Sequence, residues 1–485
     1  MKIEIKDHIF REYDIRGKYG EDLTPDIAES LAKAYAQYLR ERTGKERLRV
    51  SVGRDVRLSS GEIKNALLLG LIGAGLNCVD IGECPTPLQY FSLHELDLDG
   101  GIMITGSHNP PKYNGFKISV GKETIHGADI QRIKEIMKEH ARTGVTGASL
   151  VRGIVQNVDI ISKYIDYHVK GFSSTLPAEG LERPIKIVVD AGNGTAGLVA
   201  PELLKKLGCG VIELFCKPDG RFPNHHPDPT VVENLKGLIE EVKKRGADFG
   251  VGYDGDSDRI GVVDEKGRII WGDQLMVIFA RSILEKTPGA TIVGEVKCSQ
   301  TMYDEIERLG GNAVMWKTGH SLIKSRMKEL KAAMAGEMSG HIFFADRYLG
   351  FDDAIYATCR LVEILAEKRR RNPETVFSDL LKGLPETYTT PEIRVSCPEE
   401  EKFRIVESLK AAVKEGEEGL KIRKIIDIDG LRIVFDGGWA LVRASNTQPV
   451  LVMRYEAESQ ELLERFKGFV RSRIERVWPG CTMPA

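Results

Sequence analysis

The chain lacks paired cysteines, long apolar runs and any sizeable net charge. Its eight cysteines are scattered over 485 residues without a CxxC spacing, which predicts neither a zinc site nor a disulfide framework. The longest uncharged apolar stretch, residues 65–79, is shorter than the about 18 residues that a membrane span needs. The 69 basic and 71 acidic side chains leave a net charge of −2, which argues against a nucleic-acid binder. We therefore expect a cytoplasmic protein with neither nucleic-acid nor membrane partners.

Two common catalytic motifs are also missing. No GxxxxGK[ST] sequence is present, so a P-loop nucleotide site is not indicated. The GxSxG sequence of many hydrolase nucleophiles is absent as well. One dinucleotide-like pattern remains. Residues 192–197 (GNGTAG) follow an apolar run, and Glu213 comes about twenty residues later, as in an NAD fingerprint. The same pattern arises wherever a strand turns tightly into a helix, so an NAD-dependent dehydrogenase is kept as a weaker alternative.

Three stretches of the chain repeat one order of elements, over residues 49–109, 185–258 and 291–341. Each begins with a β-branched run, continues through a helical pattern, and ends with a second apolar run and a polar, glycine-containing loop. Strands that alternate with helices predict α/β domains with largely parallel sheets. Ligands of such sheets bind at the carboxyl ends of the strands, where these polar loops lie.

The last part of the chain has a different pattern. Helical stretches at 399–414 and 459–477 flank short strands at 431–435 and 440–442, which predicts a small α+β domain. We expect breaks between domains at 141–149, 264–267 and 368–374. We expect four domains: 1–150, 151–265, 266–371 and 372–485.

The strongest local motif is DGDSDR, in which Asp254, Asp256 and Asp258 follow the apolar run FGVGY. Three carboxylates within five residues repel one another unless a hard cation binds them, and Mg²⁺ is favoured where phosphate supplies a further ligand. The spacing resembles a calcium loop, but Arg259 stands where that loop requires glycine. Arg259 would instead suit a phosphate oxygen.

Three further loops carry polar groups. Ser107 lies in TGSHNPP as a candidate nucleophile, or as a turn serine before two prolines. Glu337, Ser339 and His341 lie in GEMSGH, a set that suits sugar hydroxyls or an ordinary polar turn. RASNT, which begins at Arg443, suits a phosphate or a capping turn.

The motifs FREYDIRG, TGSHNPPKYNGFK, DGDSDR, GEMSGH and RASNTQP, in this order, resemble the α-D-phosphohexomutase family and its bacterial phosphomannomutase/phosphoglucomutase branch. The resemblance spans nearly the whole chain. It implies three topologically related α/β domains with mixed, largely parallel sheets and a C-terminal α+β domain, arranged around a central cleft. It also implies that Ser107 carries a phosphoryl group and that Mg²⁺ is held by Ser107, Asp254, Asp256 and Asp258.

The resemblance implies a role for each matching position. Ser107, His108, Lys117 and Arg259 would be catalytic. The substrate would be bound by Tyr13, Arg16, Lys297, His320, Glu337, Ser339, Arg443, Ser445, Asn446 and Thr447.

The expected activity is interconversion of hexose 1-phosphate and hexose 6-phosphate through phospho-Ser107 and a hexose bisphosphate. The sugar would be mannose, glucose or both, and the protein a monomer or weak homo-oligomer. The alternatives are a phosphoglucosamine mutase, a catalytically silent sugar-phosphate binder and the NAD-dependent dehydrogenase.

Overall fold

The structure, a computed structural model, describes residues 4–144, 151–176, 181, 183–413, 420–446, 448–479 and 481. The chain forms two compact units. The first comprises Met1–Leu275 and Ser339–Leu380, and the second comprises Met276–Met338 and Leu381–Ala485.

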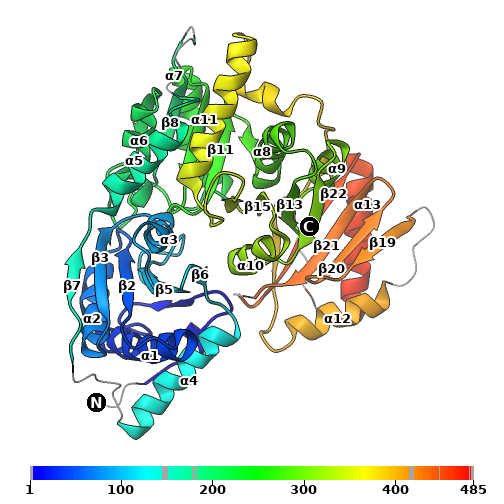
Figure 1. The fold of residues 1–485 in the computed structure, drawn as a ribbon. Helices are drawn as coiled ribbons and strands as arrows, with labels where there is room; N and C mark the ends of the chain where they lie inside the picture. Colours follow the sequence, from blue (N-terminus) through cyan, green and yellow to red (C-terminus); the bar gives the residue numbers. More distant parts are fainter. Residues whose placement is uncertain are drawn as a thin grey trace. The chain divides into compact units, whose positions relative to one another are not determined.

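The first unit begins with a seven-stranded sheet in the order β1-β5-β4-β2-β3-β7, with β6 beside β5 (Figure 1). Its strands are β1 (Ile15–Lys18), β2 (Arg49–Arg54), β3 (Asn77–Glu83), β4 (Gly100–Ile104), β5 (Tyr113–Val120), β6 (Glu123–Thr124) and β7 (Val155–Asn157). Its helices are η1 (Asp7–Ile9), α1 (Pro25–Thr43), α2 (Ser60–Gly73), α3 (Thr86–Glu95) and α4 (Ala128–Thr143). β2 pairs in parallel with β3 and β4, whereas β5 pairs antiparallel with β4.

Local sequence signals set the ends of α1. The Thr24 side chain accepts a hydrogen bond from the Ile27 amide, and Pro25 occupies the first turn, where its missing N–H costs nothing. Gly44 ends the helix with a φ of +66°, a left-handed conformation that glycine adopts freely. The buried face of α1 joins that of α2 in the core of this sheet.

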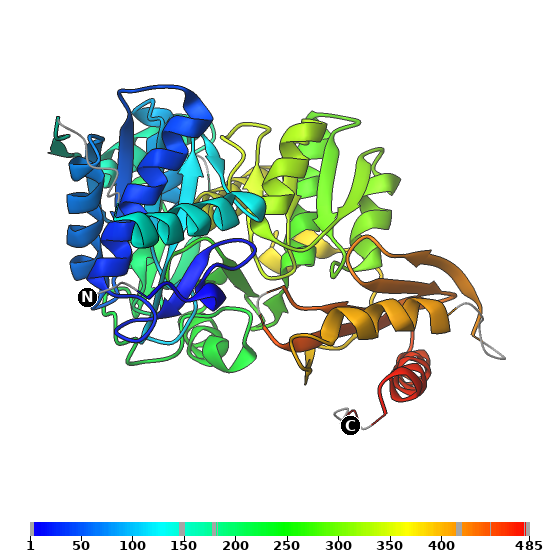
Figure 2. The ribbon, with the colours of Figure 1, turned by 90° about the horizontal axis from the view of Figure 1, so that it is seen from below.

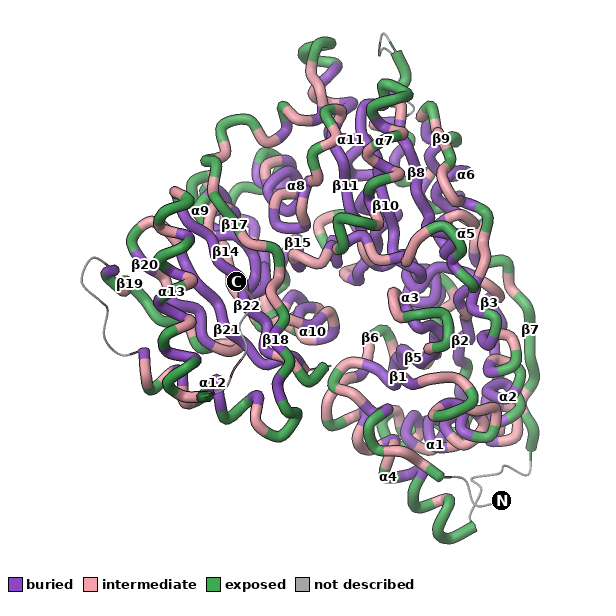
Figure 3. The backbone as a smooth tube through the Cα atoms, turned by 180° about the vertical axis from the view of Figure 1, so that it is seen from behind, coloured by how far each residue is buried: buried purple, intermediate pink, exposed green. Residues whose placement is uncertain are grey.

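The second sheet of the first unit has the order β12-β11-β10-β8-β9. Its strands are β8 (Lys186–Asp190), β9 (Gly210–Leu214), β10 (Phe249–Tyr253), β11 (Ile260–Asp264) and β12 (Ile269–Ile270). The helices are α5 (Ile160–Phe172), η2 (Thr195–Leu198), α6 (Ala200–Lys206), η3 (Val232–Leu235) and α7 (Lys236–Arg245). Every residue of β10 and β11 is buried (Figure 3).

The later segment of the first unit places a helix against this sheet. It contains β16 (Ile342–Phe344), α11 (Ala354–Arg371) and η4 (Phe377–Leu381), whose last residue already belongs to the second unit. Asp353 caps α11 by accepting from the Tyr356 amide. Tyr253 of β10 and Thr358 of α11 share a hydrogen bond of 2.6 Å, so α11 covers the second sheet (Figure 1).

Helix α8 (Gly272–Lys286) carries the chain into the second unit. There β13 (Thr291–Glu295) pairs in parallel with β14 (Asn312–Trp316) and β15 (Met334–Gly336). The helices α9 (Gln300–Arg308) and α10 (His320–Leu330) connect them. The first strand therefore lies between the second and the third in all three repeats, which confirms the predicted common topology.

The C-terminal sheet has the order β17-β22-β21-β20-β19, with β18 beside β22. The strands are β17 (Tyr388–Thr389), β18 (Ile393–Ser396), β19 (Ile422–Ile426), β20 (Leu431–Phe435), β21 (Gly438–Ala444) and β22 (Val450–Ala457). The helices α12 (Lys402–Ala412) and α13 (Gln460–Val477) share one core with this sheet (Figure 2).

The two faces of β21 have different partners. Ala440, Val442 and Ala444 pack in the core with α12 and α13, whereas Trp439 and Leu441 pack against Val296, after β13. Successive side chains of a strand point to opposite faces. Arg443 therefore lies on the face that turns toward the end of β13.

The predicted strand at 431–435 matches β20, and the predicted helices match α12 and α13 to within three residues. The break expected at 264–267 is a turn between β11 and β12, which pair antiparallel in one sheet. Part of the break expected at 141–149 lies outside the described residues. No helix in the described ranges combines the length and apolar character that a membrane crossing requires.

Candidate active site

Ser107 lies in the loop between β4 and β5 and is only 3% exposed. Its backbone has a φ of +48°, and its amide donates to Thr105 Oγ1 at 2.8 Å. Its hydroxyl donates to Asp254 Oδ2 at 2.9 Å and lies 3.0 Å from His108 Nδ1. The serine oxygen thus contacts both a carboxylate and an imidazole.

Burial holds the pKa of His108 well below its usual value, and the positive charges of Arg259 and Arg16 lower that pKa further. The imidazole is therefore neutral near pH 7. A neutral ring has one unprotonated nitrogen, which can accept a proton.

Asp254, Asp256 and Asp258 are fully buried in the loop between β10 and β11. One oxygen from each carboxylate lies within 4.8 Å of the others. Asp254 Oδ1 accepts from the amides of Asp258 and Arg259, both at 3.1 Å. Burial, and then repulsion from the other two carboxylates, raise the pKa of Asp254 well above its usual value.

Lys117 of β5 is the cation beside these carboxylates. Its ammonium donates to Asp256 Oδ2 at 2.8 Å and also to Asp258. Burial alone would lower the pKa of Lys117, but the charges of Asp256 and Asp258 outweigh it and raise that pKa well above its usual value. Thr86 Oγ1 also donates to Asp256 Oδ2, at 2.6 Å. Lys117 is thus ionised and bound to two members of the cluster.

The donor set fits a hard metal cation. Asp256 Oδ1 is buried and accepts no hydrogen bond from any described residue. Carboxylate oxygens are the ligands that Mg²⁺ and Ca²⁺ prefer. The three aspartates exceed the single charge of Lys117, so the loop can hold a metal ion beside Ser107.

A chain of contacts that the sequence did not predict holds Arg259. Its Nε donates to His341 Nε2 at 2.9 Å, and His341 Nδ1 lies 3.0 Å from Asp352 Oδ2. From the sequence, His341 is placed only in the GEMSGH loop, as a residue suited to sugar hydroxyls. Asp352 carries no motif signal, because it becomes a neighbour of His341 only through the fold.

Arg16, another predicted residue of the first unit, contacts the serine loop. Arg16 donates to Asn109 Oδ1 at 3.0 Å, in the serine loop, and pairs with Asp14. Tyr13 and Ser339 are half-buried.

In the second unit, Lys297 follows β13 and lies between two carboxylates. Its ammonium is 3.4 Å from Glu295 Oε1 and donates to Glu392 Oε2 at 3.2 Å. Burial alone would raise the pKa of Glu392, but Lys297 and then Arg394 lower it to about 2. Lys297 is therefore a buried cation already neutralised by the chain.

Arg443 is held in the same way. Its Nε donates to Asp429 Oδ2 at 3.1 Å, and the same oxygen accepts from the Thr318 amide at 3.0 Å. The next amide, that of Gly319, donates to Glu337 Oε1 at 2.8 Å. Three loops of the second unit thus link Arg443 to Glu337.

The remaining predicted residues of the second unit lie near this group. Ser445 Oγ accepts from the Gln448 amide at 3.2 Å in the hairpin between β21 and β22, which also holds Asn446. His320 is the first residue of α10. Thr447 lies outside the described residues.

The glycine loop at residues 192–197 supports the carboxylate loop. A Cβ atom at Gly194 would lie 2.8 Å from the Gly255 carbonyl oxygen, and the Thr195 amide donates to that same oxygen at 3.1 Å. Thr195 Oγ1 also contacts Ser257 Oγ at 2.9 Å. Gly194 thus allows close packing of the two loops, a role that needs no dinucleotide.

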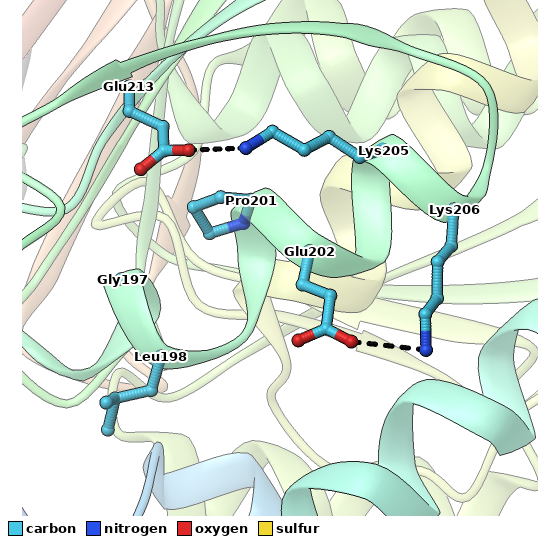
Figure 4. A pocket seen from close by; sticks show the side chains of 7 residues that line it. All are labelled: Gly197, Leu198, Pro201, Glu202, Lys205, Lys206 and Glu213. Atoms are coloured by element: carbon cyan, nitrogen blue, oxygen red, sulfur yellow. Dashed lines mark hydrogen bonds and ion pairs between the residues drawn. The ribbon is translucent and has the colours of Figure 1, made fainter.

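A surface hollow of about 500 Å³ beside α6 contains none of the predicted site residues (Figure 4). Lys205 pairs there with Glu213 at 2.5 Å, and Lys206 pairs with Glu202 at 3.1 Å. Glu213, the acid of the dinucleotide pattern, is thus engaged by a surface lysine. The hollow is lined by Gly197, Leu198, Pro201, Glu202, Lys205, Lys206 and Glu213.

Comparison with known proteins agrees with this architecture. The chain matches all four domains described for phosphoglucomutase/phosphomannomutase: the alpha/beta/alpha domains I, II and III over residues 7–143, 162–267 and 271–388, and the C-terminal domain over 392–472. A phosphomannomutase/phosphoglucomutase of Pseudomonas aeruginosa is 45% identical over 477 residues, covering 98% of this chain and 97% of that protein. A phosphoglucomutase of Neisseria gonorrhoeae is 43% identical over 479 residues, covering 97% and 98%.

A solved structure has the same fold. The phosphoglucomutase/phosphomannomutase family protein of Burkholderia thailandensis aligns with a TM-score of 0.88 at 40% identity, over 99% of this chain and 100% of that one. The fold and the site define an α-D-phosphohexomutase. Within that class, the chain belongs to the bacterial phosphoglucomutase/phosphomannomutase branch.

Proposed function

We propose that this chain is an Mg²⁺-dependent mutase that interconverts hexose 1-phosphate and hexose 6-phosphate, of mannose, glucose or both. Hexose-phosphate mutase activity follows from the names of its whole-chain relatives. The observation that carries the mechanism is Ser107 Oγ, which lies 2.9 Å from Asp254 in a buried cluster of three aspartates. A serine there can exchange a phosphoryl group beside a bound cation.

The aspartate loop would hold Mg²⁺, with phospho-Ser107 as a further ligand. Bound there, the ion would neutralise charge on the phosphoryl group during transfer. Arg259 would bind a phosphoryl oxygen, in the orientation set by its hydrogen bond to His341.

Phosphoryl transfer would exchange one P–O bond and one proton between Ser107 and the sugar. The sugar hydroxyl oxygen forms a bond to phosphorus, the P–Oγ bond of phospho-Ser107 breaks, and the sugar hydroxyl loses a proton while Ser107 Oγ gains one. His108 Nδ1, 3.0 Å from Ser107 Oγ, can hold the proton at the serine end. The product is a hexose bisphosphate. The reverse transfer, from its other phosphate to Ser107, completes the isomerisation.

The second unit would bind the part of the sugar phosphate that does not react. Glu337 would accept hydrogen bonds from sugar hydroxyls, as would Ser339 at the edge of the first unit. Arg443 and Lys297 would bind the other phosphate. The remaining substrate contacts would come from Tyr13, Arg16, His320, Ser445, Asn446 and Thr447. We propose that segments 1–150, 151–265, 266–371 and 372–485 supply the serine, metal, sugar and phosphate loops in turn.

A parallel assay tests this proposal. Glucose 1-phosphate, mannose 1-phosphate and glucosamine 1-phosphate are offered with Mg²⁺ and a trace of the matching bisphosphate. We expect turnover of glucose 1-phosphate, mannose 1-phosphate or both, and loss of turnover in Ser107→Ala. Preference for glucosamine 1-phosphate would instead indicate a phosphoglucosamine mutase. Binding of all three without turnover would indicate a sugar-phosphate binder.

A further inference from the structure

Arg57 is a fully charged side chain in an unusual place. It follows β2 and is only 1% exposed. Its Nε pairs with Asp55 Oδ2 at 3.0 Å. Buried arginines are rare unless their donors are satisfied, so the other atoms that bind this guanidinium indicate why it is there.

The other four hydrogen bonds of the Arg57 side chain all go to backbone carbonyls of one segment, from Ser107 to the first residue of β5. Nη2 donates to the carbonyl oxygens of Ser107 at 2.7 Å and Asn109 at 2.6 Å. Nη1 donates to those of Pro110 at 2.7 Å and Tyr113 at 3.0 Å. Only a guanidinium has enough donors in a rigid plane for this set, because a lysine offers three donors from a single atom.

The Asp55 carboxylate binds the same loop by accepting a hydrogen bond from the Gly106 amide. Its Oδ2, which accepts from Arg57, also accepts from the Gly106 amide at 3.1 Å. Its Oδ1 accepts from the Arg57 amide at 3.0 Å and from Ser60 Oγ at 2.6 Å. The Asp55–Arg57 pair therefore fixes the backbone on both sides of the reacting serine.

The loop needs such support. Ser107 has a φ of +48°, which a residue with a Cβ atom adopts only when its surroundings enforce it. Gly106 packs directly against the Arg57 guanidinium, where a Cβ atom would lie 2.6 Å from both Cζ and Nε. Only glycine fits at this position. This conformation turns the Ser107 carbonyl toward Arg57 while its hydroxyl reaches Asp254.

We propose that Arg57, supported by Asp55, is a positioning residue for phosphoryl transfer at Ser107; this rests on the function proposed above. Arg57 acts through the serine backbone. Phosphorylation adds about −1.5 to −2 charges to Ser107. The backbone bonds to Arg57 hold the serine oxygen in one place whether that charge is present or absent.

The test compares Arg57→Lys with Arg54→Lys in the full-length protein. Arg54 lies three residues earlier, and its side chain bonds to Glu83 and the Asp55 carbonyl rather than to the serine loop. For each protein we would measure kcat, KM, thermal stability and the rate at which glucose 1,6-bisphosphate phosphorylates Ser107, followed by intact mass.

We expect Arg57→Lys to lower kcat and the phosphorylation rate together by about 100-fold, the effect of misplacing a reacting group by about 1 Å. We expect KM to change less than threefold, and Arg54→Lys to match the wild type. A folded Arg57→Lys protein with wild-type kcat would overturn the proposal.

Asp55→Asn is the second variant if Arg57→Lys does not fold. It keeps an acceptor for the Gly106 amide but removes the charge that pairs with Arg57, so we expect a smaller loss of kcat at unchanged KM. A rise in KM with a wild-type kcat would overturn the proposal. If the wild type neither turns over nor becomes phosphorylated, the proposed function itself fails, and this outcome is distinct from any result with the variants.

Discussion

The serine region of the first unit and the Arg443 region of the second handle charge in opposite ways. Around Ser107, three buried aspartates face one lysine, which leaves an excess of negative charge. In the second unit, Lys297 and Arg443 are each neutralised by a carboxylate, Glu392 or Asp429. The first region is therefore arranged to receive a cation, whereas in the second each cation is already held in place by a carboxylate.

The largest expected effect concerns the serine. Ser107→Ala removes the oxygen that we propose carries the phosphoryl group but leaves the carboxylates in place. We expect kcat/KM to fall by about 10⁴-fold or more, with no phosphorylated species by intact mass. Retained phosphorylation of the variant would show that another residue is the acceptor.

Lys117→Met tests the excess negative charge of the first region. Without the ammonium, Asp256 and Asp258 each lose a buried ion pair. Breaking a buried ion pair costs about 3–5 kcal/mol. We expect a melting temperature well below that of the wild type in EDTA, and partial recovery when Mg²⁺ is added.

Lys64→Met is the matched control, since Lys64 pairs with Asp80 away from the carboxylate loop. Its melting temperature should respond to Mg²⁺ as the wild type does. A melting temperature of Lys117→Met that does not rise with Mg²⁺ would contradict a cation site at the aspartates.

Asp429→Asn tests the neutralised cations of the second region. The change weakens the hydrogen bonds that Asp429 accepts from Arg443 and from the Thr318 amide. Because Gly319 follows Thr318, the hydrogen bond from the Gly319 amide to Glu337 should weaken as well. We expect KM for the sugar phosphate to rise about tenfold and kcat to change less than threefold, since this residue is expected to position ground-state contacts. Asp427→Asn, at an exposed position two residues earlier, should leave both constants unchanged. A fall in kcat alone would place Asp429 in the chemical step instead.

The last expected effect concerns pH. Glu392 has a pKa of about 2 in the folded chain, against 4.5 for an unperturbed glutamate. Since the folded pKa is depressed, Glu392 contributes stability above pH 4.5 and loses it as pH falls toward 2. Between pH 5 and pH 3 this amounts to about 2 kcal/mol. The melting temperatures of the wild type and Glu392→Gln should therefore converge over this interval, and a constant gap would show that the lysine does not set this pKa.

The sequence predicted the parts of this site that local patterns encode. The polar loops that follow apolar runs contain Ser107, the three aspartates and Glu337, which the sequence predicted as site residues. The predicted fold class and family are confirmed. The strand at 440–442 is longer in the structure, as β21, because it pairs along its length with β22, which local periodicity did not indicate.

The positioning residues were missed for a related reason. Asp55 and Arg57 lie about fifty residues before the serine loop, and Asp429 lies fourteen before Arg443. An Asp-x-Arg sequence directly after an apolar strand was the one available signal for the first pair. Only the pairing of β2 with β4 brings that pair to the serine loop.

The alternation along β21 restricts how this chain can vary in length. One side of the strand faces α12 and α13, and the other carries Trp439, Leu441 and Arg443. Inserting or deleting one residue between positions 439 and 443 would reverse the faces of every later side chain, placing a guanidinium in the apolar core. Insertions or deletions in this strand should therefore prevent folding of the C-terminal sheet, whereas substitutions that preserve its alternation should be tolerated.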